Sequence, residues 1–405
     1  MLLVVGVFVV LVAATSGESG AEGDMIHYVY WTRLVSINGI QAAYSGTYHE
    51  TYAVYPPVTL YGLALAGGAY RLWVDPGFDV DQALHSSWLV RAIKLTAVGW
   101  HLFCAQAIYL LVQRQAGRRL AGVAGLAYAL NPAAVLDVAY WGQLDGAHSL
   151  FSVLALGWLT GGLLAPSAAA MALAVLAKPQ AWLILPVYAI GLVRQANATR
   201  FVQTALVGAG AGALVLLPFL LSGRFGEFLT LPGTVASVMP TVTGNAHNVW
   251  WLVLARHGYD PFASDDLARF VGPLTYRGAA TVLVGAVLLF TCSLYWRRKT
   301  GLAETAALGV LGWFLFTTQA HENHLFLVLP LLALAWPTRR LLLVPFVLLT
   351  ITLFWNIALH DHLLFDVLQM DPDSRPIQVA RLVNASINLL MWLTWCLAGM
   401  LRRAR

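Results

Sequence analysis

The sequence predicts an all-α, polytopic membrane protein. Of its 405 residues, 59% are apolar and only 11% are charged, against roughly 25% charged residues in an ordinary soluble domain. With a mean hydropathy of +0.70, the chain has too few polar side chains to cover a water-exposed surface. These figures exclude a soluble globular enzyme and a disordered chain. The 3 cysteines lie in apolar runs, so we expect neither a disulfide framework nor a metal cluster.

About twelve apolar segments approach the roughly 20 residues that a membrane-spanning helix needs. One run, 167–193, is interrupted at Lys178-Pro179-Gln180, which predicts two short helices meeting at a polar hinge. A shorter run covers 324–337. We expect residues 1–14 to form a first span that starts upstream of Met1, because they make a helix of only about 21 Å. The other predicted spans are 88–113, 119–135, 146–164, 201–222, 276–296, 300–318, 340–357 and 382–401.

Basic residues predict the orientation of these spans. Lys and Arg concentrate in cytoplasmic loops, so the segments 15–87, 222–275 and 358–381 are expected on the opposite, extracytoplasmic face. Basic clusters alternating with apolar runs do not form a nucleic-acid surface, despite a net charge of +5. We therefore predict one membrane domain, 1–405. The clusters are Arg114, Arg118 and Arg119; Arg194 and Arg200; Arg297, Arg298 and Lys299; Arg339 and Arg340; and Arg402, Arg403 and Arg405.

The large first outer loop, 15–87, contains an apolar segment that we do not expect to cross the membrane. If 57–73 crossed, the first basic cluster would lie outside. Tyr61, Tyr70 and Trp73 suit a helix lying in the outer interface.

Candidate functional side chains begin in this loop. Asp24 is either a general base or a plain loop carboxylate or helix N-cap. Tyr55 precedes Pro56 and Pro57, which make a rigid corner. This corner is either purely structural, or its aromatic neighbourhood, with Trp31, stacks on a sugar or a lipid head.

A second set of candidates follows the span 119–135. Gly142 and Gly146 flank a Trp, a Gln and an Asp (Trp141, Gln143 and Asp145), which suits irregular backbone lining a cavity. An ionisable group close to membrane depth is a functional candidate by default. Capping of the next helix is the alternative for Asp145.

Three cations are candidates for binding a lipid-linked phosphate. Lys178 lies between two apolar half-helices with no acid nearby in the sequence, and such an ammonium needs an anion or must snorkel. Arg91 and Lys94 lie one helical turn apart at the outer end of 88–113. Snorkelling to lipid headgroups is the alternative for all three.

His321, Glu322 and Asn245 complete the candidates. His321 and His324 are three residues apart, whereas the zinc-protease pattern requires four. We therefore favour contact with phosphate or sugar hydroxyls, and predict no metal and no cofactor. Polar motifs gathered on one face, without the midplane charges and internal repeats of a transporter, favour a one-sided enzyme acting on a lipid phosphate.

The joint order of these motifs resembles the GT-C superfamily of polytopic glycosyltransferases over about residues 20–337. The likeness is to dolichyl-phosphate-glucose glucosyltransferases of N-glycan assembly and to bacterial relatives of the GPI mannosyltransferases. The motifs are Gly23-Asp24…Trp31, Tyr55-Pro56-Pro57-Val58-Thr59-Leu60-Tyr61, Trp141-Gly142-Gln143-Leu144-Asp145, Lys178-Pro179-Gln180, Asn245…Trp250 and His321-Glu322-Asn323.

The resemblance implies a GT-C-like fold and transfer of a hexose, with inversion, from a polyprenyl-phosphate carrier to a lipid-linked or cell-envelope acceptor. Mannose and glucose are the expected sugars, and the plasma membrane is the expected location in a bacterium. The family's catalytic aspartate lies seven residues before a Trp, as Asp24 precedes Trp31. Its His-Glu motif, here His321 and Glu322, helps to hold the donor phosphate. A flippase for lipid-linked sugars and a non-catalytic subunit of an envelope-assembly complex remain the alternatives.

Overall fold

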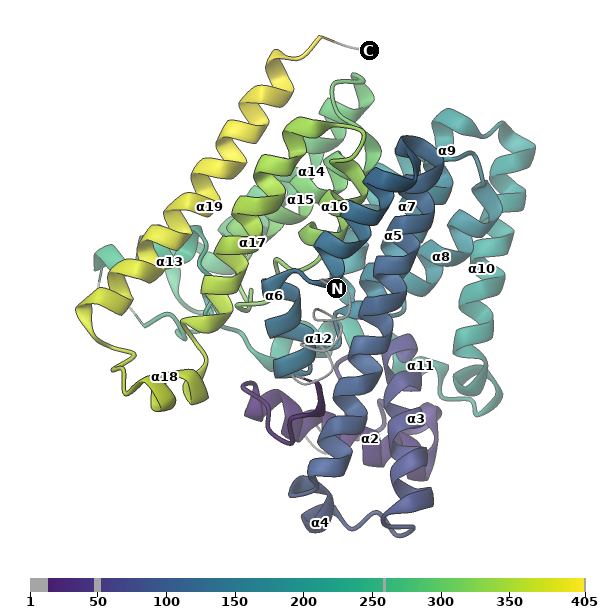
Figure 1. Ribbon diagram of the computed structural model, residues 1–405, viewed down its shortest axis with the longest axis vertical. Coiled ribbons are helices and arrows are strands. Elements are labelled where there is room, and N and C mark those ends of the chain that lie inside the picture. Colours follow the sequence, from purple (N-terminus) through teal and green to yellow (C-terminus); the bar gives the residue numbers. More distant parts are fainter. Residues whose placement is uncertain (1–13, 47–51, 258–259, 404–405) are drawn as a thin grey trace. The chain divides into compact units, whose positions relative to one another are not determined.

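The computed structural model describes residues 14–46, 52–257 and 260–403 (Figure 1), so the predicted first span lies outside the described residues except for Ala14. The described chain is largely helical, as predicted. In its first part the elements are α2 (Glu22–Asn38), η1 (Ile40–Ala42), α3 (Pro57–Trp73), α4 (Val80–Leu84), α5 (Ser87–Ala129), α6 (Pro132–Ala134), η2 (Val135–Trp141), α7 (Gly146–Thr160), α8 (Leu164–Val175), η3 (Pro179–Ile184), α9 (Leu185–Gln195), α10 (Ala198–Leu221), α11 (Phe225–Leu229) and α12 (Leu231–Val238).

The remaining elements follow residue 238. They are α13 (Val249–His257), β1 (Arg269–Val271), β2 (Leu274–Thr275), α14 (Tyr276–Trp296), α15 (Leu302–Phe316), α16 (Val328–Ala335), η4 (Arg340–Leu342), α17 (Leu343–Ala358), α18 (His362–Leu368) and α19 (Arg375–Leu401). The short strands β1 and β2 form one antiparallel pair.

The chain divides into two compact units, each assembled from separate stretches of sequence. The first unit comprises residues up to Leu110 with 125–181 and 197–238. The second comprises 111–124, 182–196 and everything from Met239 onward. A single membrane domain over the whole chain stays a prediction.

Among the described residues, five helical segments are long and apolar enough to cross a bilayer, and three shorter apolar helices accompany them. The chain is thus an integral membrane protein. The predicted span 276–296 coincides with α14, and the break predicted at Lys178 separates α8 from η3 and α9. The five segments are Ser87–Trp141, Ala198–Leu221, Tyr276–Trp296, Arg340–Ala358 and Arg375–Leu401.

Helix α5 contains both predicted spans 88–113 and 119–135, joined at a break. Gly117 there has φ +83°, a left-handed conformation that favours glycine. Beyond it the helix folds back. A Cβ placed on Gly125 would lie 3.2 Å from the Ala105 carbonyl oxygen, and His101 Nε2 lies 3.1 Å from the Ala129 carbonyl oxygen. The two predicted spans therefore form a helical hairpin.

Close helix packing in the first unit depends on small residues. Helix α2 packs on α3, where Gly67 faces Thr32 and Ser36. Helix α8 packs between α7 and α10, where Gly208 faces Ala168. Small side chains let helix backbones approach closely inside a membrane, where water does not drive helices together.

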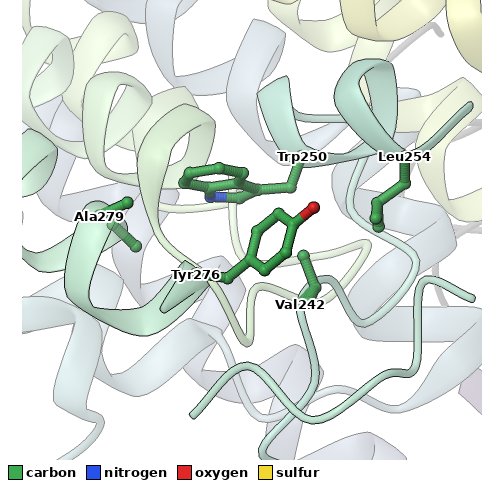
Figure 2. Close-up of a cluster of buried hydrophobic side chains, with 6 residues drawn as sticks. Val242, Trp250, Leu254, Tyr276 and Ala279 are labelled. Carbon is green, nitrogen blue, oxygen red and sulfur yellow. The ribbon is translucent and has the colours of Figure 1, made fainter. Parts of the chain in front are cut away.

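The second unit has an aromatic core beneath the β1–β2 pair. Figure 2 shows the rings of Trp250 and Tyr276 side by side with Val242 and Leu254; the two rings meet edge to face, with centroids 5.5 Å apart. The indole N–H of Trp250 donates to the Phe316 carbonyl oxygen at 3.0 Å. This bond ties α13 to the end of α15.

Charged side chains also join helix ends in the second unit, at loops that carry basic residues. The carboxylate of Glu304, in the first turn of α15, is 1% exposed and accepts hydrogen bonds from Arg339 and Arg402. Trp395 Nε1 also donates to it at 3.2 Å. Two sequence-distant clusters of basic residues thus meet at Glu304, as expected if they share one side of the membrane.

The glycine pair in α3 tests the packing of α2 on α3. A Cβ at Gly67 would lie 2.5 Å from Ser36 Oγ and 2.8 Å from Thr32 Cγ2, whereas a Cβ at Gly68 meets nothing within 4 Å. Gly67→Ala is expected to lower the free energy of unfolding by about 1–3 kcal/mol through overpacking. Gly68→Ala is expected to raise it by about 0.5–1 kcal/mol through helix propensity. Chemical unfolding in detergent measures both, and equal effects would contradict the packing described.

Candidate active site

The first turns of α2 present three of the key side chains on one helix face. Asp24, Tyr28 and Trp31 are spaced four and three residues apart, so they lie above one another along the helix. The N-cap interpretation of Asp24 is wrong, because Ala21 occupies that position without a side-chain cap. Asp24 is instead an exposed carboxylate in the first turn, where the helix dipole favours negative charge.

Gln143 connects this helix face to the loop after η2. Its Nε2 donates to Asp24 Oδ2 at 2.5 Å, and its Oε1 accepts from the Tyr28 hydroxyl at 2.7 Å. The Tyr28 and Tyr55 hydroxyl oxygens lie 3.2 Å apart. A continuous chain of polar groups therefore runs from Tyr55 to the Asp24 carboxylate and restricts its orientation.

A π-helical turn places Gln143. The element η2 is a π-helix, a rare form that is frequent at functional sites, and it ends at Gly142 with φ +81°. A Cβ on Gly142 would lie 2.7 Å from Met25 Cε and 2.9 Å from Lys94 Cγ, so only glycine fits. The Trp141 carbonyl oxygen accepts from Ser19 Oγ at 2.6 Å. Backbone geometry thus brings the predicted Trp141–Asp145 motif against α2.

Lys178 has a buried carboxylate partner. Its Nζ lies 2.8 and 2.9 Å from the two Asp145 carboxylate oxygens, and both residues are 2% exposed. His148 Nε2 lies 3.7 Å from Asp145 Oδ1. The sequence analysis required Lys178 to find an anion or to snorkel, and the anion is Asp145, 33 positions earlier in the chain. Asp145 occupies the N-cap position of α7, as the capping alternative expected, but its side chain makes no cap hydrogen bond there.

Aromatic rings form one wall beside this ion pair. The centroids of Trp31 and Tyr55 lie 5.4 Å apart, and those of Tyr28 and Trp31 lie 5.8 Å apart. Lys178 Nζ lies 5.2 Å from the centre of the Tyr55 ring. Burial raises the pKa of Tyr55 to about 12 and the pKa of Tyr28 well above its usual value. Both hydroxyls therefore keep their protons at neutral pH.

Lys94 and Arg91 bind the segment before α2. Lys94 Nζ donates to Ser16 Oγ at 2.7 Å and to the Glu18 carbonyl oxygen at 2.9 Å. Arg91 Nε donates to the Thr15 carbonyl oxygen at 2.8 Å. Lys94 is completely buried, which is incompatible with snorkelling, whereas Arg91 is exposed.

The remaining predicted residues lie in the second unit. Asn245, with φ +64°, forms an isolated β-bridge with His321, and the Gly244 N–H donates to the Ala320 carbonyl oxygen at 2.8 Å. Glu322 follows as a half-buried residue. Tertiary structure thus brings the Asn245 and His321 motifs together. Within the part of the chain that the structure describes, no three His, Cys, Asp or Glu residues are placed to hold a metal ion.

Two further residues of this site escaped the sequence analysis. Tyr28 lies four residues after Asp24, and His148 three after Asp145. Helical spacing from each predicted carboxylate was the signal that could have identified them. The contact of Tyr28 with Gln143 joins segments more than 100 residues apart. The contact of His148 with Asp145 depends on the fold of α7.

A scan against protein-family models found no match, and a search of curated proteins found no relative. Among solved structures, the chain is similar to ArnT from Cupriavidus metallidurans bound to undecaprenyl phosphate, with a TM-score of 0.53 and 16% identity. The alignment covers 98% of this chain and 76% of that one. The chain therefore shares the fold of that ArnT structure.

The apo form of ArnT aligns at a TM-score of 0.48 and 16% identity, over 98% of this chain and 75% of the other. The similarity to the undecaprenyl-phosphate-bound form confirms the predicted GT-C-like, all-α membrane architecture. At this identity the likeness concerns the fold. The roles of individual side chains in this chain stay predictions.

The Asp145–Lys178 pair is testable by a double-mutant cycle. Lys178→Met and Asp145→Leu are each expected to lower the free energy of unfolding by about 3–5 kcal/mol, because each leaves one buried charge without its partner. The double variant should lose markedly less than the sum, since neither charge remains. Unfolding in detergent measures the cycle, and additive losses would contradict a direct interaction.

Proposed function

We propose that the protein is an inverting glycosyltransferase that moves a hexose, mannose or glucose, from a polyprenyl-phosphate carrier to a lipid-linked or cell-envelope acceptor. The reaction takes place on the extracytoplasmic face of the plasma membrane. The observation that carries the proposal is the exposed Asp24 carboxylate held by Gln143, beside buried cations and an aromatic wall in a GT-C fold. The ArnT structure holds undecaprenyl phosphate in that protein, which supports a carrier of this class here.

Asp24 is the general base of the proposed reaction. It takes the proton from an acceptor hydroxyl while the hydroxyl oxygen forms a bond to the anomeric carbon of the sugar. The bond from that carbon to the carrier phosphate breaks, and its electron pair leaves with the phosphate. Attack on the side opposite the leaving group inverts the anomeric carbon. Gln143 orients the carboxylate for this step, because it binds Oδ2.

The departing phosphate gains negative charge, which cations of the chain stabilise. Lys94 and Arg91 are bound by hydroxyl and carbonyl oxygens, which carry no net charge. The charge of Lys178 is matched by Asp145, so this pair adds donors without adding net charge. We therefore assign the principal countercharge of the first unit to Lys94 and Arg91. Lys178 and His321 are assigned direct phosphate contacts.

Rings and amides orient the sugar in this scheme. Trp31 and Tyr55 offer apolar faces of the kind that stack on a pyranose ring, and their hydroxyl and indole edges are polar. Trp141, Gln143 and Asp145 come from the loop after η2. The sequence resemblance adds Asn245 and Glu322 to this group.

One incubation tests the proposed activity. Purified full-length protein is mixed with a panel of polyprenyl-phosphate sugars and a membrane-lipid extract, and products are identified by mass spectrometry. A mass increase of one hexose on an acceptor, with release of polyprenyl phosphate, is expected. Movement of the labelled donor between leaflets of a vesicle without an acceptor would instead indicate a flippase.

Replacement of the base is the sharpest test of mechanism. Asp24→Asn is expected to lower the transfer rate by about 10²–10⁴-fold, because the amide cannot accept the acceptor proton. Donor binding should stay within about twofold. Glu22, two residues before Asp24, is also exposed, so Glu22→Gln is the matched control and should retain activity. Full turnover in Asp24→Asn would exclude Asp24 as the base.

Gln143→Ala tests the orientation of Asp24. Loss of the 2.5 Å hydrogen bond is expected to lower kcat by about tenfold with little change in KM, since alignment of the base matters in the transition state. Tyr28→Phe, which removes the hydroxyl bound to Gln143, should act in the same direction but less strongly. Tyr30→Phe on the same helix is the control. An effect on KM alone would argue against an orienting role.

A further inference from the structure

A second cation-rich hollow lies wholly within the second unit and contains none of the proposed catalytic residues. It encloses about 490 Å³, within the size range of small-molecule sites. Four of its nine lining residues are cations and none of the nine is acidic. The four cations are Arg194, Arg298, Lys299 and Arg339.

Backbone contacts hold these cations in place. Arg194 donates to the carbonyl oxygens of Tyr295 and Trp296, and its guanidinium carbon lies 4.8 Å from the centre of the Tyr295 ring. Arg339 Nη2 donates to the Lys299 carbonyl oxygen at 3.1 Å. The cations are therefore anchored around the hollow, and they converge from three separate stretches of sequence.

The local charge balance stays positive. Glu304 is the acid that contacts this group, and it is shared between Arg339 and the more distant Arg402. Its carboxylate is almost completely buried behind the cations. The cations that line the hollow therefore outnumber the acid that contacts them, and a dianionic or monoanionic phosphate would be attracted to them.

The surroundings of the hollow suit a ligand that carries hydrocarbon. Trp296, at the end of the candidate span α14, is 60% exposed, as is typical of aromatic residues at a membrane interface. Along the same helix Val282 and Leu289 are 68% and 76% exposed, so a bilayer would cover them. Val193, beside Arg194, is also exposed. A lipid with its phosphate in the hollow and its acyl chains along α14 would contact both the cations and the exposed apolar side chains.

We propose that this hollow binds the phosphate group of an anionic lipid, at the membrane face where the basic clusters gather. Basic pockets among membrane helices on the cytoplasmic side are suited to anionic headgroups, and that leaflet is the negatively charged one. The site is separate from the proposed transferase chemistry and is tested by binding alone. A lipid in this position would neutralise cations that otherwise repel one another across α9, α14 and the 338–339 turn.

Adjacent arginines provide matched variants. Arg297 and Arg298 are both exposed, but only Arg298 lines the hollow. Full-length protein in a neutral detergent is titrated with phosphatidylglycerol, and bound lipid is counted by native mass spectrometry. Arg298→Gln is expected to weaken phosphatidylglycerol binding about fivefold. The double variant, Arg194→Gln with Arg298→Gln, is expected to weaken it by about tenfold or more. Arg297→Gln should change it less than about twofold. Phosphatidylcholine should bind equally weakly to all of them.

Two outcomes would overturn the proposal. Equal phosphatidylglycerol affinity in Arg298→Gln and Arg297→Gln would remove the hollow as the binding site. Binding of glycerol phosphate or inorganic phosphate as tightly as the lipid, with the same sensitivity to Arg298→Gln, would identify a soluble phosphate as the occupant. Thermal unfolding of each variant establishes that the fold is retained, and Arg298→Gln alone spares the backbone contacts of Arg194.

Discussion

Water does not solvate a charge buried inside a membrane protein, so an ionised side chain buried there needs a partner within the chain. This constraint accounts for the most specific features of the structure. Asp145 and Lys178, both 2% exposed, bind each other across 33 residues of sequence. In the second unit, buried Glu304 is bound by two arginines and an indole N–H. Each ion pair fixes the relative position of the helix ends that carry it, which apolar packing alone would not specify.

The same constraint separates two kinds of charged site. In the first unit the buried Asp145 and Lys178 neutralise each other, so this pair adds no net charge near the exposed Asp24 carboxylate. In the second unit the cations outnumber the buried acid around a hollow. Excess positive charge at the end of a spanning helix is an arrangement that suits a phosphate headgroup.

Irregular backbone segments set the positions of individual side chains and helices. The π-helical turn η2 and the left-handed Gly142 place Gln143 against Asp24, and Gly67 lets α2 approach α3 closely. Such features store little stability by themselves. Their value lies in directing side chains that come from segments more than 100 residues apart, as in the 119-residue separation of Asp24 and Gln143.

Composition and local pattern determined the class of this protein. Long apolar runs must form helices in a membrane, because only a helix satisfies its own backbone there, and so α14 and α3 could be delimited from the sequence. Lys178 and Pro179 marked the break between α8 and η3 from local sequence alone. Only the tertiary structure decided which polar groups meet: that Lys178 binds Asp145, that Tyr28 holds Gln143, and that Arg194 and Arg339 share one hollow. Those pairings depend on how helices pack and how a π-turn aims its side chains, and neither leaves a periodic signal in the sequence.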